Sequence, residues 1–377
     1  MAYKKTLTKE ERQQKQDEYE REVADLFIKA IKENKAPWTK PWEPGVNVLD
    51  YNMFNMTKGG KQNNHYKGIN GLICELNRSF FLHSDDPRWC TVANLMEHNK
   101  SIEDTRETLW IKKGEKGTTI RFFEKKYFDE NGKQIHFDDE HPEDRNKEVA
   151  FTKTVLKPWV IFNASQIGKY TYDEHGEKVK DENGNFVYRP AFEPIEIDKN
   201  DKNRFKPIIE PETLVRNTGA EVMHDQIDQC FYRESDDRIH LVNPEKFESA
   251  EAYYATLLHE LTHWTGVEER LNREEFKKYN SSKEWRAKEE LVAQIASYQL
   301  CKDLNLKFIP DQRDISYVDS WCSFIKDKPQ GIFEACQKAK KASDFIQDFS
   351  NKNTKKEVLT NEVNIEIEVT KKKAKSR

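Results

Sequence analysis

The chain has 377 residues, of which 34% are charged and 36% hydrophobic, and its formal net charge is −4. No segment approaches the roughly 20 consecutive apolar residues that span a bilayer, and the basic N-terminal residues are not followed by the apolar segment of a secretory signal. The six cysteines are scattered without a C-x-x-C pair, which argues against a cysteine zinc site and a disulfide framework. We therefore expect a cytoplasmic protein without a membrane partner, and the length predicts two domains.

The first predicted element is a helix over 8–34. Charged residues occupy most of this segment, its apolar stripe is narrow, and Pro37 ends the helical pattern. A compact region rich in tryptophan and phenylalanine follows over about 38–167. The helix and this region together form the first predicted domain, over 1–169.

Two strands are predicted inside this domain. Thr118–Phe123 has the β-branched and aromatic composition of a strand, and the Asn131-Gly132 pair then predicts a hairpin turn. Val155–Phe162 predicts a second strand, and Pro158 within it favours a position at an edge of the sheet. These elements indicate a mixed α/β module.

The rest of the chain divides by composition. Charges, prolines and a turn signal dominate 170–205, which we interpret as a linker or an exposed hairpin. A mainly helical domain is predicted over 206–349. The final segment, 350–377, is a charged tail with few aromatic residues, and we expect it to be disordered. The predicted fold class is therefore α+β with two domains.

The segment His259-Glu260-Leu261-Thr262-His263 has the His-Glu-x-x-His spacing of a metal site. On a helix, two histidines four residues apart lie on one face and can bind one ion, and the glutamate can act on water at that ion. At about 100° per residue, His263 lies about 40° from His259, and the apolar residues of the segment lie on the opposite face. A bare match arises by chance in about one chain of this length in a hundred. The face placement favours a metal site over a pair of surface histidines.

A catalytic zinc site has three protein ligands and one open position. Glu269 follows the first histidine after a glycine turn, and Glu289 and Glu290 lie on the next predicted helix. Helix geometry does not choose between the two adjacent glutamates, and a solvent-facing position is the competing interpretation for at least one of them. We rank Glu290 first, Glu269 second and Glu289 third. The expected ion is Zn²⁺, with Mn²⁺ as the alternative.

The predicted chemistry is metal-dependent peptide hydrolysis. A zinc ion lowers the pKa of bound water towards about 7 and polarises a carbonyl group. Glu260 would take the proton of that water and return it to the leaving amine. The negative charge that develops on the tetrahedral oxygen needs a hydrogen-bond donor. The sequence does not choose among the candidates His224, His240, Tyr253, Tyr279 and Tyr298.

Several motifs together resemble a known family. The segments 254–266, 270–273 and 289–293 are similar to the zincin-like metallopeptidase domain of ArdC antirestriction proteins, and plasmid TraC-type primases share related segments. The N-terminal half is similar to the single-stranded-DNA-binding domain of the same family, and the resemblance covers about 25–348. Its N-terminal motifs are Ala36-Pro37-Trp38, Pro41-Trp42, Asn64–Asn70, Pro87-Arg88-Trp89, Lys112–Thr118 and Val160–Ile167.

The resemblance implies an N-terminal module that binds single-stranded DNA and a C-terminal, gluzincin-like metallopeptidase fold. It also implies a role in shielding incoming plasmid or phage DNA from restriction, and an unknown protein or peptide substrate. Similar sites take their third metal ligand from a glutamate on the second helix, which supports Glu290. One position departs from the family pattern Glu-Leu-x-Ala-Glu, because Gln294 replaces the last glutamate. If that glutamate acts at the metal or next to it, the site in this chain is altered.

The residues of the N-terminal half suit single-stranded DNA. Sequence-independent binding of a single strand needs cations along the backbone and aromatic faces for base stacking. The turn Lys112–Gly117 would present lysines and backbone N–H groups to phosphate. The competing interpretation is that the tryptophans belong to the core. The expected DNA contacts are Trp38, Trp42, Tyr66, Lys67, Arg88, Lys112, Lys113, Lys116 and Arg121.

Two other functions are compatible with these residues. One is a DNA-binding protein whose metallopeptidase domain is catalytically silent. The other is a peptidase whose N-terminal half recognises a protein. Antirestriction activity that survives Glu260→Ala would favour the first, and a lack of salt-dependent DNA binding would favour the second.

Overall fold

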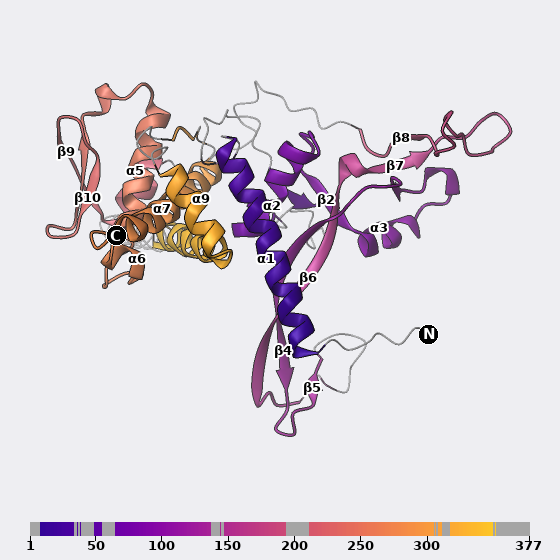
Figure 1. Ribbon diagram of the computed structural model, residues 1–377, viewed down its shortest axis with the longest axis horizontal. Coiled ribbons are helices and arrows are strands. Elements are labelled where there is room, and N and C mark those ends of the chain that lie inside the picture. The colour runs from indigo at the N-terminus through magenta and orange to yellow at the C-terminus, as the bar shows by residue number, and fades with distance from the viewer. Residues whose placement is uncertain are drawn as a thin grey trace, which may run out of the picture. The chain divides into compact units, whose positions relative to one another are not determined.

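The computed structural model describes residues 8–33, 36, 38, 49–54, 65–136, 144, 147–193, 211–304, 306, 308–310, 317–349 and 351. The chain forms two compact units, which we call the sheet unit and the helical unit. The sheet unit is Leu49–Glu196, and the helical unit combines Met1–Val48 with Ile197–Arg377. Figure 1 labels the elements of both units. None of the described helices is long and apolar enough to cross a membrane.

The sheet unit is built around a five-stranded sheet with the strand order β1-β2-β6-β4-β5. Strands β1 and β2 are parallel, and the other neighbours are antiparallel. A smaller, three-stranded antiparallel sheet has the order β3-β7-β8. The strands span Tyr51–Asn52 (β1), Arg88–Thr91 (β2), Trp110–Ile111 (β3), Thr118–Phe128 (β4), Gln134–Ile135 (β5), Phe151–Asn163 (β6), Ile167–Tyr170 (β7) and Tyr188–Pro190 (β8).

Short helical segments connect these strands. They are α2 (Gly68–Leu76), η1 (Asn77–Phe81), α3 (Val92–Asn99), η2 (Thr105–Glu107) and η4 (Ala164–Gln166). Thr91 begins α3 with a capping box, in which its hydroxyl accepts a hydrogen bond from the Asn94 N–H at 3.1 Å. Cys90, Leu95 and Ile167 belong to a buried apolar cluster of this unit. The cysteine is thus a buried core residue with a free thiol, which fits the absence of a disulfide framework expected from the scattered cysteines.

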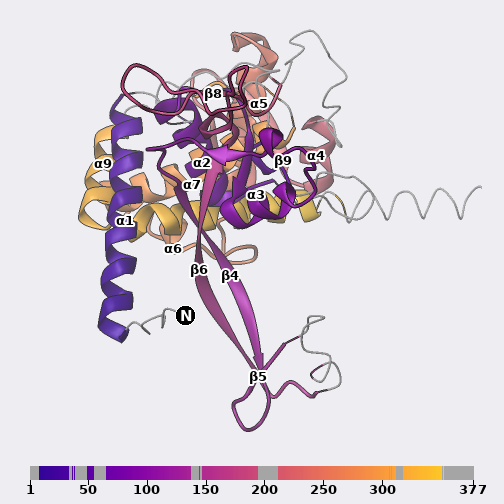
Figure 2. The same cartoon turned by 90° about the vertical axis from the view of Figure 1, so that its right-hand side faces the viewer.

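Strands β4 and β6 form a long two-stranded ribbon in the sheet unit. Their register pairs every residue of Thr118–Phe128 with a partner in β6, and both views show the ribbon running away from the other strands of its unit towards β5 (Figures 1 and 2). Both predicted strands are present and are longer than expected. Pro158 lies opposite Arg121, in a stretch where β6 pairs with β4 alone among the described residues. That stretch has an open edge, where proline is tolerated.

The segment 170–205, expected as a linker or an exposed hairpin, belongs in its described part to the sheet unit. Strand β8 pairs with β7, and isolated bridges close two small hairpins between these strands. Their turns contain Gly176 and Gly184, both at positive φ, which glycine adopts without steric cost. Residues 194–210 lie outside the described residues, as does most of the predicted disordered tail.

The helical unit combines a three-stranded sheet, of order β10-β11-β9, with packed helices. Strand β11 is antiparallel to β10 and parallel to β9. Helix α5 packs against α7 and also contacts β10 and β11. The elements span Lys9–Lys32 (α1), Pro211–Thr218 (α4), Glu221–Gln226 (β9), Phe231–Arg233 (β10), Arg238–Val242 (β11), Pro244–Lys246 (η5), Ala250–Trp264 (α5), Glu274–Lys277 (α6), Lys283–Asp303 (α7) and Val318–Asp327 (α9), and a further helix covers 330–349.

The N-terminal helix α1 belongs to the helical unit, whereas the strands that follow it in the chain belong to the sheet unit. It lies against α9, its Tyr19 ring is 5.9 Å from Phe333, and Gln330 donates a hydrogen bond to Glu20. The compact units therefore differ from the boundaries expected from composition, which placed α1 in a domain over 1–169. The apolar stripe of α1 is covered by helices at the other end of the sequence, and local composition does not encode such a contact.

Candidate metal centre

Helix α5 carries the His-Glu-x-x-His motif in its C-terminal half. Ser249 caps the start of the helix by accepting a hydrogen bond from the Ala252 N–H at 3.2 Å. Beyond the end of α5 the chain turns at Gly266, where an added Cβ would lie 2.7 Å from a ring carbon of Phe276. The glycine therefore lets the following segment return close to the helix end.

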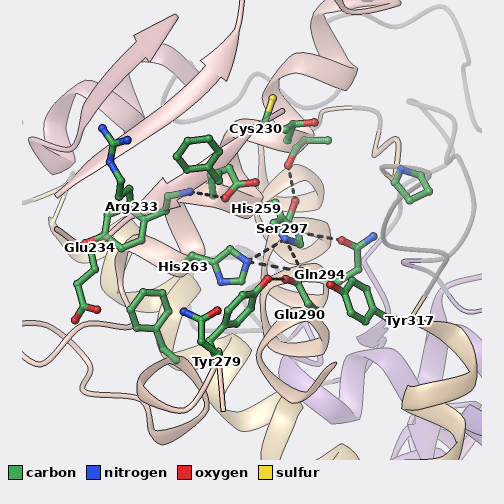
Figure 3. A pocket seen from close by; sticks show the side chains of 18 of the residues that line it. Cys230, Arg233, Glu234, His259, His263, Tyr279, Glu290, Gln294, Ser297 and Tyr317 are labelled. Carbon is green, nitrogen blue, oxygen red and sulfur yellow. Dashed lines mark hydrogen bonds and ion pairs between the residues drawn. The ribbon is translucent and has the colours of Figure 1, made fainter. Parts of the chain in front are cut away.

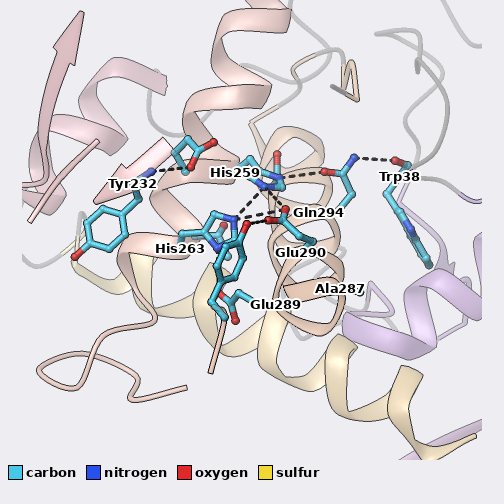
Figure 4. Close-up of polar contacts among 12 residues, drawn as sticks. Trp38, Tyr232, His259, His263, Ala287, Glu289, Glu290 and Gln294 are labelled. Carbon is cyan, nitrogen blue, oxygen red and sulfur yellow. Dashed lines mark hydrogen bonds and ion pairs between the residues drawn. The ribbon is translucent and has the colours of Figure 1, made fainter. Parts of the chain in front are cut away.

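His259 and His263 converge with Glu290 of α7 (Figure 4). The Nε2 atoms of the two histidines are 3.2 Å apart. The Glu290 Oε2 atom lies 3.2 Å from Nε2 of His259 and 3.7 Å from Nε2 of His263. All three side chains are buried. The two helices are also joined by the Ser297 hydroxyl, which donates to the Ala255 carbonyl at 2.8 Å.

Gln294 of α7 orients the first histidine. Its Nε2 group donates to the Trp38 carbonyl at 3.1 Å, which only accepts, so the amide oxygen is the atom that faces His259. That oxygen lies 3.1 Å from Nδ1 of His259. The ring therefore donates from Nδ1 and directs its Nε2 atom inward. The position that departs from the family pattern thus keeps a hydrogen-bond acceptor behind the histidine.

Glu289 and Arg273 orient the second histidine. Glu289 Oε1 lies 3.1 Å from Nδ1 of His263, and the same carboxylate accepts two hydrogen bonds from Arg273, at 2.6 and 3.1 Å. Arg273 also donates to the Thr265 hydroxyl and to the Thr262 carbonyl. Glu289 has no exposed surface. The buried ion pair therefore holds His263 from the side that faces away from Glu290.

The donor chemistry fits a metal ion. With Nδ1 of each histidine donating outward, the neutral rings direct two unprotonated Nε2 atoms at the Glu290 carboxylate. Three electron-pair donors then face one another at 3.2 to 3.7 Å, an arrangement that needs a positive charge among them. Two imidazole nitrogens and one carboxylate oxygen also match the ligand set of catalytic zinc sites. The three residues could therefore hold Zn²⁺ or Mn²⁺.

The pKa shifts of the residues in this centre also indicate that a positive charge is favoured there. Burial raises the pKa of the Glu290 carboxyl, but its hydrogen bonds with His259 and His263 outweigh burial and hold that pKa well below the usual range. Burial lowers the pKa of His263, but the Glu289 and Glu290 carboxylates outweigh it and raise the pKa to about 10. A proton on His263 supplies the positive charge in the metal-free centre, and a metal ion would replace that proton.

Glu260 lies beside this centre and is held by a contact with strand β10. Its Oε2 atom accepts a hydrogen bond from the backbone N–H of Tyr232 at 3.0 Å (Figure 4). Tyr232 lies in β10, an edge strand of its three-stranded sheet among the described residues. Burial raises the pKa of Glu260, and the nearby histidines lower it by a smaller amount. A carboxyl group with a raised pKa suits proton transfer near neutral pH.

The centre opens into a cavity of about 430 Å³ (Figure 3). Strand β10, the facing sides of α5 and α7, and the segment 308–310 contribute to its wall. The Tyr279 hydroxyl reaches into this cavity and donates to Glu290 Oε1, and its ring and that of His263 lie edge to face with their centroids 6.0 Å apart. Burial, followed by the Glu290 charge, raises the pKa of Tyr279, so the phenol stays protonated.

The structure separates the candidates for the third ligand. Glu290 joins the two histidines, whereas Glu269 is exposed and Glu289 is paired with Arg273. It also separates the five candidate oxyanion donors, because only Tyr279 among them lines the cavity. The other four have different partners. His240 lies between Asp225 and Asp236, His224 contacts Tyr253, and Tyr298 packs on Phe308.

Two of the expected DNA contacts are buried. The Trp38 side chain has no exposed surface, and its ring stacks on Phe27 with the centroids 5.5 Å apart, inside the helical unit. The expectation that Trp38 stacks on a base is therefore corrected, since a fully covered ring offers no face to a ligand. Tyr66 is only 9% exposed and lies 6.3 Å from Phe122, so its ring is mainly a packing element. Trp42 lies outside the described residues.

The expected cations differ in their availability. Arg88 is half-buried and paired with Asp86 at 2.6 Å, and the Lys112 ammonium donates to the Ser165 carbonyl at 2.8 Å. Arg121 is half-buried within β4. The exposed lysines of the set are Lys67, Lys113 and Lys116. Among the described residues of the set, these three are therefore the cations whose side chains are exposed to solvent.

Sequence reasoning did not select the exposed aromatic residues of the β4–β6 ribbon. Phe122, Phe151 and Trp159 are 42%, 40% and 39% exposed. A signal for two of them exists in the sequence, because aromatic, lysine and valine side chains alternate with period two from Phe151 to Trp159. That alternation indicates one exposed face of a strand.

The fold and the site define the class of protein as one with a zincin-like metallopeptidase domain. A family described as a zincin-like metallopeptidase matches residues 210–338, and the N-terminal domain family of the anti-restriction factor ArdC matches residues 16–157. The chain therefore carries a domain of the ArdC N-terminal family followed by a domain of the zincin-like metallopeptidase family.

Solved structures of a relative share this architecture. The metal-free crystal structure of the antirestriction protein ArdC from plasmid R388 is 27% identical, with a TM-score of 0.57, over 88% of this chain and 98% of that chain. Its Mn(II)-bound structure is 25% identical, with the same TM-score, over 88% and 97%.

Two DNA primases named TraC, from Escherichia coli, are also similar. They are 32% identical over 343 residues and 30% identical over 339 residues, which is 89% and 88% of this chain. The chain spans only 27% and 20% of their own lengths. The protein y4eC of Sinorhizobium fredii (strain NBRC 101917 / NGR234) is 26% identical over 63% of this chain and 66% of its own length.

Proposed function

We propose that this protein is a metal-dependent peptidase joined to a unit that binds single-stranded DNA, and that it protects incoming plasmid or phage DNA from restriction. The observation that carries the proposal is the convergence of His259, His263 and Glu290 beside the buried carboxyl group of Glu260. The match to the ArdC N-terminal domain family and the similarity to the ArdC structures support the DNA-binding and antirestriction parts. The proposed substrate class of the peptidase site is a protein or peptide.

Glu260 is the proposed general base. A bound Zn²⁺ or Mn²⁺ ion would polarise the scissile carbonyl and acidify a water molecule. The Tyr232 N–H holds the Oε2 atom of Glu260, which leaves Oε1 to accept the proton of the attacking water and to pass it to the leaving nitrogen. The raised pKa of the buried carboxyl favours the first of these transfers, because it makes the carboxylate a stronger base.

Tyr279 is the proposed donor to the oxygen that becomes negative during the reaction. It lines the cavity, its hydroxyl group is protonated, and its present acceptor, Glu290, belongs to the metal centre itself. A modest rotation of the phenol would redirect the O–H towards a carbonyl oxygen in the cavity. Such a donor stabilises the tetrahedral state more than the substrate.

Metal content tests the centre first. We expect about one Zn²⁺ or Mn²⁺ ion per purified wild-type chain, lost in His263→Ala and in Glu290→Ala. Glu269→Ala is the matched control. It also replaces a glutamate by alanine, but at an exposed position that is not one of the three metal-ligating residues. Elemental analysis that finds no metal in the wild type, or that finds it retained in Glu290→Ala, would contradict the proposed ligand set.

A cellular assay tests the peptidase part separately. Glu260→Gln keeps the size of the side chain and removes the base, so we expect it to retain metal and lose protection against restriction. Protection that survives in this variant would favour the catalytically silent alternative, in which the metal has only a structural role.

Titration with single-stranded DNA tests the binding part. We expect wild-type binding that weakens as salt rises, and a smaller salt dependence when the exposed Lys67, Lys113 and Lys116 are replaced by alanine. A wild type that shows no salt-dependent binding would favour a peptidase whose sheet unit recognises a protein.

A further inference from the structure

We propose that one face of the β4–β6 ribbon is the contact surface for single-stranded nucleic acid. The inference rests on the proposed DNA-binding function and assigns it to side chains outside the expected set. These residues lie opposite one another in the strand register and therefore share one side of the sheet. This ribbon face consists of Phe122, Glu124, Lys126 and Phe128 of β4 and of Phe151, Lys153, Val155, Lys157 and Trp159 of β6, and it ends at the buried Ile120, which lies opposite Trp159.

The ribbon face exposes large apolar side chains along its whole length. Phe122, Phe151, Val155 and Trp159 are 39 to 42% exposed. Scattered single exposed apolar residues are common in proteins, but these four follow one side of one two-stranded ribbon. Apolar side chains gathered in this way indicate a surface that a ligand covers.

Lysines stand beside the aromatic rings. The Lys153 ammonium lies 5.2 Å from the Phe128 ring centroid and 5.5 Å from that of Phe151, and the Lys157 ammonium lies 5.2 Å from the Trp159 ring. Phe128 and Phe151 stack across the strands at 5.1 Å with an angle of 8° between their planes. Ring faces flanked by cations are the combination that stacks on bases while it neutralises phosphates.

Charge selects nucleic acid over an apolar partner. The described side chains of the ribbon face include one carboxylate, Glu124, and three lysines, Lys126, Lys153 and Lys157. Glu124 lies 3.5 Å from Lys157. A second copy of this chain would bring the same lysines into contact with one another, which like charges oppose. A polyanion with flat apolar groups complements both features of the face.

The geometry further selects a single strand over a duplex. The bases of a duplex are stacked on each other and paired, so their faces cannot reach protein aromatic rings. From Phe151 to Trp159 the strand extends about 26 Å at roughly 3.3 Å per residue. The rings of Phe151 and Trp159, at the two ends of this stretch, would contact several nucleotides of one extended strand.

Replacement of the aromatic platforms is the direct test. Fluorescence anisotropy with a labelled oligothymidylate of about 15 nucleotides, within the site sizes of known single-strand-binding modules, would compare the full-length wild type with Trp159→Ala, Phe151→Ala and Trp159→Phe. We expect each alanine variant to weaken binding roughly 5- to 100-fold, from the loss of one base stack. Trp159→Phe retains a ring and should lose much less.

The lysines provide a second, charge-matched test. Lys153→Ala with Lys157→Ala should lower the slope of log affinity against log salt by about 0.7 for each phosphate contact removed from a single strand. Lys326→Ala with Lys341→Ala removes the same charge from exposed positions of the helical unit and should leave the slope near that of the wild type. Circular dichroism and metal content of every variant report whether the fold is kept.

The outcomes separate the ribbon face from the proposed function. Wild-type binding that is weakened by the ribbon variants and not by the control pair supports the inference. Single-strand binding that the ribbon variants leave unchanged overturns the ribbon face and leaves the proposed function standing. Equal affinity for a duplex of the same length overturns the stacking interpretation. A wild type that binds no single strand overturns both proposals.

Discussion

The metal centre and the ribbon face differ in how their side chains are held. In the metal centre, each histidine has an outer partner, and these partners are themselves anchored by Trp38 and Arg273. On the ribbon face, lysine ammonium groups lie 5.2 Å from aromatic ring centroids, and Phe122, Phe151 and Trp159 remain 39 to 42% exposed. The difference fits their tasks, because an ion needs ligands at fixed positions, whereas a flexible polymer needs only platforms at suitable spacing. Substitutions in the two regions should therefore have different consequences.

The largest expected effect is on catalysis in the metal centre. Glu260→Gln should lower peptide hydrolysis by about 10²- to 10⁴-fold, the usual contribution of a general base. Hydrolysis would be followed with a library of quenched fluorescent peptides and the metal-loaded protein. Residual activity close to that of the wild type would show that another group takes the proton.

The next effect is on stability and concerns the buried ion pair. Arg273→Ala removes the guanidinium partner of the fully buried Glu289 carboxylate and leaves His263 as its remaining charged partner, and the loss of one partner of a buried pair typically costs about 3–5 kcal/mol. Urea denaturation of the metal-free protein measures the change. The exposed pair Lys278–Glu274 is the control, since Lys278→Ala should cost less than about 1 kcal/mol.

Removal of the acceptor behind His259 should weaken metal binding more than folding. Gln294→Leu abolishes the hydrogen bond to Nδ1, and loss of such an outer partner typically lowers metal affinity by about 10- to 100-fold. Gln294→Glu keeps an acceptor for His259 and should retain the metal. Competition with a chelator measures both variants. Unchanged affinity in Gln294→Leu would rule out the orienting role of Gln294.

The raised pKa of His263 predicts a pH dependence of the metal-free protein. A folded-state pKa of about 10 lies above the value of roughly 6.5 in the unfolded chain. The stabilisation by this proton is therefore fully present below about pH 6.5 and is lost as the pH rises through about 10. Because a metal ion competes with the same proton, metal affinity should rise with pH over this window. Denaturation of wild type and His263→Gln from pH 6.5 to 9.5 checks the first part, and the variant should show less of the decline.

The smallest expected effect is on stability and concerns the aromatic rings of the ribbon face. Trp159→Ala and Phe151→Ala remove exposed rings, so each should change the free energy of unfolding by no more than about 0.5 kcal/mol. Thermal or urea denaturation measures this value. A loss of several kcal/mol would mean that these rings stabilise the sheet unit and would weaken the case for a binding surface.

Local sequence was sufficient where the signal repeats over a short distance. The spacing of His259 and His263 on one face of a helix depends on periodicity alone, and the strand that precedes the Asn131-Gly132 turn depends on local composition. The family resemblance extended this to the order of the two domains, and the matches to both family descriptions agree with it. The period-two alternation in β6 was equally local, but the alternation by itself does not say which of its two faces is covered.

Only the tertiary structure decided which side chains meet. Glu289 and Glu290 are neighbours about 100° apart on one helix, so periodicity treats them alike until α7 packs on α5 and turns one towards the histidines and the other towards Arg273. Trp38 was compatible with stacking on DNA or with burial until α1 joined the helical unit and covered its ring. In both cases the deciding contact joins residues far apart in the chain, and the orientation of one helix on another is set by packing across the whole interface.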